Sequence, residues 1–265
     1  MTNGKNSQMN VLVCGAAGWV GRAVLANLQG RHRVCAFDRS CDAWECVEDL
    51  DGPPPKSMDM IHGDIVDFDT VDQVISGVDA IIHLTAHFPS KQSEENQDDQ
   101  ASFLVNLKGL WNVLESARRH QVSRVVHVGS CHVVHPQGVF YDGGIRRQDG
   151  TLYAVCKRLQ EEMCRQYYDA FQSSIIVLRP CTIVDARLGV DRWKRKLGSQ
   201  SLQYESGWVC RHDLAEACRL AIEHEHIDFE VLHVVGTKEA GKLCNVARTC
   251  ELLGLKIQGD LARYR

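Results

Sequence analysis

A tyrosine and a lysine stand four residues apart in TLYAVCKRLQEEMCRQYYDAF, residues 151–171. If this segment is a helix, Tyr153 and Lys157 share one face, because residues four apart are neighbours on a helix surface. Free tyrosine, with a pKa of about 10, is a poor base at neutral pH. A nearby ammonium group favours the phenolate, which can take a proton from a hydroxyl group. The alternative is an exposed pair without a catalytic role, because such pairs are common on helices.

A serine ends the apolar run RVVHVGS, residues 124–130. If this run is a strand of a parallel sheet, Ser130 lies at its carboxyl end, where reacting groups gather in such sheets. A hydroxyl group there can hydrogen-bond a reacting oxygen atom and stabilise its charge. A serine at a strand end also serves as an ordinary turn or cap residue.

Three glycines follow the first apolar run of the chain, in VLVCGAAGWVGRAVLANL, residues 11–28. Gly15 can adopt a backbone conformation closed to other residues. Gly18 leaves the approach to a phosphate open, and Gly21 lets a helix pack closely on the strand. The N–H groups and the dipole of that helix then face a pyrophosphate. The spacing is GxxGxxG rather than the commoner GxGxxG, and an ordinary tight loop is the alternative.

An aspartate ends the next apolar run, 17 residues after Gly21. This spacing is close to that of the carboxylate that binds the adenosine ribose in dinucleotide-binding folds. Asp38 would accept hydrogen bonds from the ribose hydroxyls and repel a 2′-phosphate, so NAD is favoured over NADP. Arg39 works against this preference, because a cation there can accommodate the phosphate. A strand-end turn is the alternative role for Asp38.

The elements that must position these residues alternate along the chain. Apolar runs rich in Val and Ile predict strands, and segments of helical periodicity follow them. Runs without polar alternation indicate a sheet that is covered on both faces. The order predicts an α/β fold with a doubly wound parallel sheet, as in Rossmann domains. The predicted strands are 10–14, 33–37, 58–61, 79–85, 124–129, 174–178 and 229–235, and the predicted helices are 19–29, 68–76, 100–120, 152–171, 212–224 and 243–253.

The pattern of apolar runs also predicts how the chain is divided. The polar segment 87–100 is either a solvated loop or a flap over the carboxyl ends of the strands. After about residue 180 the periodicity loosens and cations become frequent. We expect a disordered N-terminal extension over 1–9, a Rossmann domain over 10–183, and a small C-terminal substrate-covering region over 184–265, of which 208–236 returns to the Rossmann core.

The composition is that of a soluble globular protein, with 44% hydrophobic and 24% charged residues. The net charge of −4 provides no basic field for a nucleic-acid partner. No apolar run has the length of a membrane span or the character of a signal peptide, so we expect a cytoplasmic protein without a membrane partner. The 12 cysteines include no CxxC pair, so we expect no metal site. Without a secretory signal we also expect no disulfide framework.

Taken in order, these motifs resemble the extended short-chain dehydrogenase/reductase superfamily, specifically its NAD-dependent epimerase/dehydratase family. The segments YAVCK, LRPCTIV and NLKGLWN add to the resemblance. It implies catalysis by Ser130, Tyr153 and Lys157, with Lys157 also binding the nicotinamide ribose. The cofactor contacts that it implies come from Gly15, Gly18, Trp19, Val20, Gly21, Asp38, Arg39, Asp64, Ile65, Leu84, Thr85, Ala86, Asn106, Tyr153, Lys157, Pro180 and Thr182.

The motifs SCH and DGTLYAVCK, with the short chain, resemble the uronate dehydrogenase subgroup most. Its members use NAD to oxidise the anomeric carbon of a free sugar acid to a lactone. The resemblance implies substrate contacts from Cys131 and His132, and an arginine that holds the substrate carboxylate. Arg187 and Arg192 are the candidates, because guanidinium pairs bidentately with carboxylate. A solvated cationic loop is the alternative for both arginines, and a structural role is the alternative for His132.

Three functions therefore compete. The first is a dehydrogenase that takes hydride from a hydroxyl carbon of a sugar, sugar acid or similar polyol and releases NADH. The second is a nucleotide-sugar epimerase or dehydratase that retains its NAD, and the third is a non-catalytic NAD(P)-binding protein. The short chain leaves room for a small cap, which favours the first, and the complete set of Ser130, Tyr153 and Lys157 favours an enzyme.

The predicted helices 100–120 and 152–171 carry apolar residues beyond one stripe. In the family such helices form a two-fold dimer seam, which implies a homodimer. The alternative is that these residues cover the sheet. Among them are Leu104, Leu107, Leu110, Trp111 and Leu114.

Overall fold

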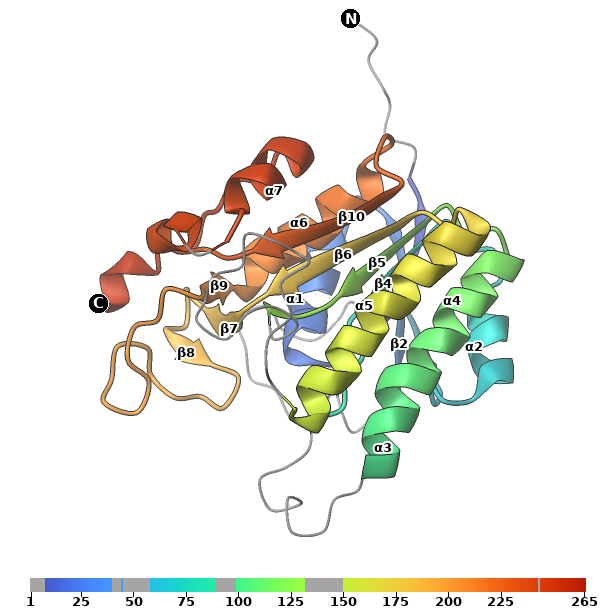
Figure 1. The fold of residues 1–265 in the computed structure, drawn as a ribbon, viewed down its shortest axis with the longest axis horizontal. Coiled ribbons are helices and arrows are strands. Elements are labelled where there is room, and N and C mark those ends of the chain that lie inside the picture. The colour runs from blue at the N-terminus through green and yellow to red at the C-terminus, as the bar shows by residue number, and fades with distance from the viewer. Residues whose placement is uncertain (1–7, 40–43, 45–57, 89–98, 132–149, 243) are drawn as a thin grey trace, which may run out of the picture.

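The computed structural model describes residues 8–39, 44, 58–88, 99–131, 150–242 and 244–265. A seven-stranded parallel sheet lies at its centre (Figure 1). The strand order turns back between β1 and β4, and ligands bind at such switch points, outside the carboxyl ends of the strands. The predicted α/β fold with a doubly wound sheet is thereby confirmed. Across the sheet the strands are β3 (Asp59–His62), β2 (Arg33–Asp38), β1 (Asn10–Cys14), β4 (Ala80–His83), β5 (Arg124–Val128), β6 (Ile175–Pro180) and β10 (Phe229–Val234).

Helices cover both faces of the sheet, which explains why its strands are apolar without alternation. One face packs on α1 (Trp19–Leu28), α6 (Arg211–Glu223) and α7 (Val246–Leu253). The other packs on α2 (Phe68–Ile75), α4 (Gly109–Arg119) and α5 (Leu152–Phe171), as Figure 1 shows. Each face has its own hydrophobic core, and the sheet separates the two.

The predicted helix 100–120 is interrupted. It consists of α3 (Asp99–Phe103), a π-helical turn (Leu104–Lys108) and α4. Such turns often occur at functional sites, because they reorient side chains within a helix. Here the turn contains Asn106, whose amide bonds the backbone of His87 through both of its polar atoms, at 2.8 Å and 3.1 Å.

A second, three-stranded sheet follows β6, where the sequence predicted no strands. Its order is β8 (Val190–Asp191), β7 (Thr182–Asp185) and β9 (Trp208–Cys210). A core around the buried Trp208 supports it. These strands are two to four residues long, which is too short for an alternating pattern to be recognised. After β9 the chain returns to the main sheet through α6 and β10; the division of the chain at residue 184 stays a prediction.

Other element ends differ from the prediction by a few residues. The strand predicted over 79–85 ends at His83, so Leu84, Thr85 and Ala86 leave the sheet. The helix predicted over 243–253 begins at Val246, after Asn245, whose side chain accepts a hydrogen bond from the N–H of Arg248. Two 3₁₀ turns, Lys238–Lys242 and Ala262–Tyr264, complete the C-terminal part. Across the described ranges, no helix combines the length and the apolar character needed to span a membrane.

Candidate active site

The glycine turn joins β1 to α1 beside the end of β4. Gly15 has φ +81°, and a Cβ there would lie 2.9 Å from the backbone nitrogen of Thr85. A Cβ on Gly21 would lie 2.3 Å from the carbonyl oxygen of Gly15, so that glycine lets the helix start against the turn. Gly18 is the N-cap of α1 and has no side chain to bond the first N–H groups. The N–H groups of the first turn precede the first helical bond, from Arg22 to Gly18, and are the donors that bind anions at a helix start.

Asp38 closes the turn from the neighbouring strand. One of its carboxylate oxygens accepts a hydrogen bond of 2.8 Å from the N–H of Ala17, and the other accepts one of 2.7 Å from the N–H of Arg39. The side chain stays half-buried and lines the adjoining cavity, whereas Arg39 is exposed. A carboxylate held in this way presents acceptor oxygens to a ribose, in agreement with the preference for NAD.

A cavity of about 1380 Å³ extends from the glycine turn over the carboxyl ends of β4, β5 and β6. This volume exceeds the range of about 300–1000 Å³ typical of small-molecule sites, and it is large enough for a dinucleotide together with a small substrate. The residues of the predicted site that line it are Gly15, Gly18, Trp19, Val20, Gly21, Asp38, Leu84, Thr85, Ala86, Ser130, Tyr153, Lys157, Pro180, Thr182 and Arg192.

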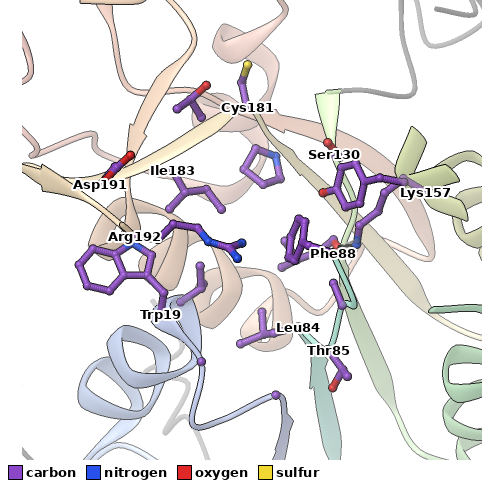
Figure 2. Close-up of a pocket in the computed structure, with 18 of the residues that line it drawn as sticks. Trp19, Leu84, Thr85, Phe88, Ser130, Lys157, Cys181, Ile183, Asp191 and Arg192 are labelled. Atoms are coloured by element: carbon purple, nitrogen blue, oxygen red, sulfur yellow. Dashed lines mark hydrogen bonds between the residues drawn. The ribbon is translucent and has the colours of Figure 1, made fainter. Parts of the chain in front are cut away.

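Tyr153 and Lys157 reach this cavity from the first two turns of α5. Thr151 caps the helix by accepting a hydrogen bond from the N–H of Ala154. The Nζ atom of Lys157 donates to the carbonyl of Val128 at 3.1 Å, at the end of β5, and lies 5.9 Å from the ring centroid of Tyr153. Figure 2 shows Ser130 and Lys157 on the same side of the cavity. The structure therefore brings the three predicted catalytic residues together.

The pKa values at the site differ from the expectation for a lysine-assisted phenol. Burial raises the pKa of Tyr153 to about 12, against opposing effects from a hydrogen bond with Ser130 and from the positive charge of Arg192. Burial also lowers the pKa of Lys157 to about 8. The ammonium group of Lys157 is bonded to the backbone of β5 and not to the phenol. The groups that lower the pKa of Tyr153, and so favour its phenolate, are Ser130 and Arg192.

Arg192 is the predicted substrate arginine that reaches the cavity. Its guanidinium lies 4.4 Å from the ring centroid of Phe88, and the Phe88 ring also stacks on Tyr153 with centroids 4.8 Å apart. Figure 2 shows the guanidinium directed into the space between Trp19 and Phe88. Burial lowers the pKa of Arg192, which nevertheless keeps its charge at neutral pH.

A buried carboxylate shapes the turn that presents Arg192. Asp191 accepts hydrogen bonds from the backbone N–H groups of Trp193 and Arg195, at 3.0 Å and 2.9 Å, and pairs with the Arg195 side chain at 2.6 Å. Arg187, the other candidate, lies outside the cavity. Its guanidinium is 3.5 Å from Asp185, and its side chain is 41% exposed.

Five residues that were expected to contact the cofactor or the substrate lie outside the cavity lining. Asp64 is exposed and accepts a hydrogen bond from the N–H of Val66, and Ile65 is buried beneath Gly109. Asn106 is buried behind His87, and Arg39 projects to solvent. Cys131 is buried in a small apolar cluster. None of these described residues lines the cavity, so their roles stay predictions, as does that of His132, which lies outside the described residues.

Two further residues that shape the site, Phe88 and Arg211, could not be predicted from the sequence. Phe88 lies in segment 87–100, for which the sequence allows either a solvated loop or a flap. Its stacking on another aromatic ring depends on the fold and cannot be seen in a sequence. Arg211 is fully buried and pairs with Asp185 at 2.8 Å, while its Nη1 atom donates to the carbonyl of Trp19 at 3.0 Å. It thereby ties the small sheet to the first turn of α1. In the sequence, the only sign of Arg211 is that a cation precedes the predicted helix 212–224.

Comparisons with known proteins agree with this geometry. Residues 11–234 match the NAD dependent epimerase/dehydratase family. A uronate dehydrogenase from Pseudomonas syringae pv. tomato is 26% identical over 171 residues, which cover 64% of this chain and 58% of that protein. A second uronate dehydrogenase, from Agrobacterium fabrum, is 28% identical over 182 residues, covering 65% of this chain and 61% of that one. The chain thus matches about three fifths of the length of these relatives.

Solved structures share the fold. A uronate dehydrogenase variant from Agrobacterium tumefaciens in complex with NAD superposes with a TM-score of 0.74 at 21% identity, covering 98% of this chain and 88% of that one. An epimerase from Methanothermobacter thermautotrophicus gives 0.76 at 19% identity, covering 97% and 91%. At such identities the likeness concerns the fold alone. With the family match over most of its length, the chain belongs to the NAD-dependent epimerase/dehydratase family.

Proposed function

We propose that this protein is a dehydrogenase that takes hydride from a hydroxyl-bearing carbon of a sugar acid or related sugar and transfers it to NAD. The observation that carries the proposal is the convergence of a phenol, a serine hydroxyl and a guanidinium in one cavity, since Ser130 and Arg192 both act on the pKa of Tyr153. The first two suit oxidation of a hydroxyl group, and the third suits a carboxylate on the same substrate.

The predicted cofactor, NAD, is the cofactor of this family. The residues fit it, because Gly15 and Gly18 leave a cradle that side chains would narrow, at the start of α1. The first turn of α1 would hold the pyrophosphate, Asp38 the adenosine ribose, and Pro180 and Thr182 the nicotinamide end. The chemistry that NAD supplies when bound is acceptance of a hydride.

The protein's own residues then handle the proton. Tyr153 takes the proton from the substrate hydroxyl, and Ser130 hydrogen-bonds the same oxygen as its charge develops. Lys157 stays anchored on the carbonyl of Val128 and would also hold the nicotinamide ribose. Arg192 holds the carboxylate of the substrate, supported from behind by the stacked ring of Phe88. If the oxidised carbon is anomeric, the product of a cyclic sugar acid is a lactone.

The test is a screen for NADH formation from NAD with a panel of aldoses and uronic acids, with the Tyr153→Phe variant as control. We expect net NADH with a uronic acid and much less with the corresponding neutral aldose. Isomerisation of a nucleotide sugar without net NADH would replace this proposal with the epimerase. NAD binding without turnover of any substrate would replace it with a binding protein.

We further propose that two copies of the chain associate through α4 and α5. Leu104 in the π-helical turn, Trp111 on α4 and Leu159 on α5 leave large apolar surfaces exposed, whereas Leu110 and Leu114 face the core. Five apolar side chains of the predicted helix 100–120 were considered for a dimer seam. We now assign to the seam only those that are exposed. A cytoplasmic location stays a prediction.

A further inference from the structure

Three cysteines gather behind one wall of the cavity. Cys131 and Cys244 are each 1% exposed and pack with Val235 and Ala240, and Cys181 is packed against the same cluster. Cys181 is also part of the cavity lining. Figure 2 shows it beyond Ile183, with its sulfur directed away from the space between Arg192 and Phe88. Cys181 thus forms part of the cavity wall, with two further cysteines buried behind it.

The strand register brings two of these cysteines opposite each other. In the β5–β6 pair, Val125 is opposite Ile175 and Val128 is opposite Leu178. The N–H of Gly129 donates to the carbonyl of Leu178 at 2.8 Å, which extends the pairing past the end of β5. The same offset, carried past the ends of β5 and β6, aligns Cys131 with Cys181. The two chains leave the sheet side by side, and paired strands lie about 4.8 Å apart, within the range of about 4.4–6.8 Å for the Cα atoms of a disulfide.

The side chains meet as the register indicates. Cys181 packs against the cluster that contains Cys131, and a hydrogen bond between the two thiols acts on the pKa of both. The Cys131 sulfur also lies 3.4 Å from the carbonyl oxygen of Arg179. Gly207 leaves room for the Cys181 sulfur, because a Cβ there would lie 2.6 Å from it. The contact is therefore built by three segments of the chain.

The two thiols differ in reactivity. The hydrogen bond with Cys131 has the largest effect in lowering the pKa of Cys181 to about 7, and Thr182 adds to it against the effect of burial. The same bond and burial raise the pKa of Cys131 well above its ordinary value. At neutral pH about half of the Cys181 thiol is therefore thiolate, which is the nucleophilic form, whereas Cys131 keeps its proton.

We propose that Cys181 and Cys131 are an oxidisable thiol pair in the wall of the active-site cavity, with a hydroperoxide as the oxidant and a reversible disulfide as the product. The Cys181 thiolate attacks one peroxide oxygen, so that an S–O bond forms, the O–O bond breaks, and hydroxide or alkoxide leaves and is protonated. The Cys131 sulfur then attacks Cys181, an S–S bond forms, the S–O bond breaks, and water leaves with the proton of Cys131. Two thiols are oxidised and one peroxide is reduced.

The disulfide joins the residues that follow Ser130 and Pro180, and both of these line the cavity. A small shift of Ser130 is enough to lower turnover, because displacements near 1 Å can reduce rates by about 100-fold. We expect oxidation to lower turnover by about tenfold or more, with recovery on addition of dithiothreitol. This loss of turnover rests on the proposed function, whereas formation of the disulfide does not.

Peptide mapping of the full chain tests the pair directly. The reduced protein is treated with hydrogen peroxide, blocked with N-ethylmaleimide and digested with trypsin without reduction. Tryptic peptide 125–146 carries Cys131, and peptide 166–187 carries Cys181. We expect these two peptides to be joined and to separate on reduction. Alkylation of both after peroxide treatment, or joining of peptide 166–187 to peptide 243–248 with Cys244, would overturn the proposal.

Variants separate pairing from general oxidation. Cys35→Ser, on β2 and outside the cavity, is expected to leave the joined peptides and the turnover unchanged. Cys131→Ala removes the partner, so dimedone should trap a sulfenic acid on peptide 166–187 and no joined peptide should appear. If Cys131→Ala folds poorly, the native chain still decides, because alkylation of Cys181 by iodoacetamide should be half-maximal near pH 7. A midpoint near the ordinary cysteine value of about 8.5 contradicts the contact.

Discussion

At the scale of single residues, the role assigned to Tyr153 depends on its phenol and not on its bulk. Tyr153→Phe keeps the ring that stacks on Phe88 and removes the group that exchanges a proton. We expect turnover to fall by about 10²-fold or more, which is the usual contribution of a general acid–base group, with little change in NAD affinity. Initial rates and NAD titration measure the two. Tyr168→Phe, on the same helix but packed against Phe229, serves as the matched control.

Unchanged turnover in Tyr153→Phe would remove this residue from the mechanism. Loss of activity in Tyr168→Phe as well would mean that changes in α5 act through the fold. A third outcome, normal turnover with weak NAD binding, would assign Tyr153 to the cofactor site alone.

At the same scale, the role proposed for Arg192 is to bind the carboxylate of an acidic substrate. Arg192→Met keeps an unbranched side chain over Phe88 but removes the charge. A hydrogen bond to a charged group contributes about 1.5–3 kcal/mol, so KM for a uronic acid should rise by about 10- to 100-fold, with a smaller change in kcat. A neutral aldose should show no such rise. The comparison with Arg187→Met, which alters the arginine outside the cavity, decides between the two predicted candidates.

Equal effects of Arg192→Met on acidic and neutral substrates would contradict carboxylate recognition. The sequence could not separate Arg192 from Arg187, because both lie in a segment without periodicity. The separation comes from Asp191, whose buried carboxylate folds the turn around residue 192, and from Asp185, which holds the N–H and side chain of Arg187. By contrast, Ser130, Tyr153 and Lys157 could be chosen in advance, because each lies at a defined place on a regular strand or helix.

At the scale of elements, the glycine turn combines an unusual backbone conformation with close packing, and two glycines separate these effects. Gly15 and Gly30 both have positive φ, +81° and +75°, but a Cβ meets the backbone of Thr85 at Gly15 and nothing within 4 Å at Gly30. Gly30→Ala should lower the free energy of unfolding by about 1 kcal/mol through backbone strain alone. Gly15→Ala should lower it further and weaken NAD binding. Urea denaturation and NAD titration measure both, and equal losses of stability in the two variants would show that the contact with Thr85 carries no weight.

The ion pair between Asp185 and Arg211 connects the small sheet to α1, and its contribution to the free energy of unfolding depends on pH. Burial acts to raise the pKa of Asp185, but hydrogen bonds from His212 and Arg211 outweigh it and hold the pKa well below its ordinary value. A carboxylate with a lowered pKa stabilises the folded state above its unfolded value of about 3.9, and the contribution is lost as the pH falls below it. Asp185→Asn should lower stability at pH 7 by about 3–5 kcal/mol, because it leaves a buried cation without its partner.

The measurement is urea denaturation of the native chain, Asp185→Asn and the exposed control Asp69→Asn between pH 7 and pH 3. The native chain and Asp69→Asn should lose stability below pH 4 more steeply than Asp185→Asn does. Parallel curves for all three proteins would mean that Asp185 is not a source of the acid sensitivity.

The elements themselves were predictable to different degrees. The strands of the main sheet could be located within about one or two residues, because burial on both faces makes them continuous Val- and Ile-rich runs. The strands β7, β8 and β9 could not, since each is supported by Trp208 and its neighbours and not by a pattern of its own. The π-turn at Leu104–Lys108 was also hidden, because insertion of one residue into a helical turn barely disturbs the apolar periodicity.

At the scale of the whole molecule, the apolar surface on α4 and α5 has a consequence for assembly. These helices contact each other on one face of the sheet, as Figure 1 shows, and Leu159 on α5 is 45% exposed. Exposed apolar patches of this kind mark interfaces, and a two-fold axis would bring the same helices of two copies together. We therefore expect the chain to sediment as a dimer at micromolar concentration.

Leu159→Glu tests this surface, because a carboxylate buried at a two-fold interface would also face its own copy across the axis. We expect a shift from dimer to monomer in sedimentation velocity, with the free energy of unfolding of the monomer little changed. The control is Met60→Glu. Met60 lies on β3 at the far edge of the sheet and is about as exposed as Leu159, so this variant should leave the dimer intact. A native chain that sediments as a monomer, or a dimer that survives Leu159→Glu, would show that the side chains on this face only cover the helices beneath them.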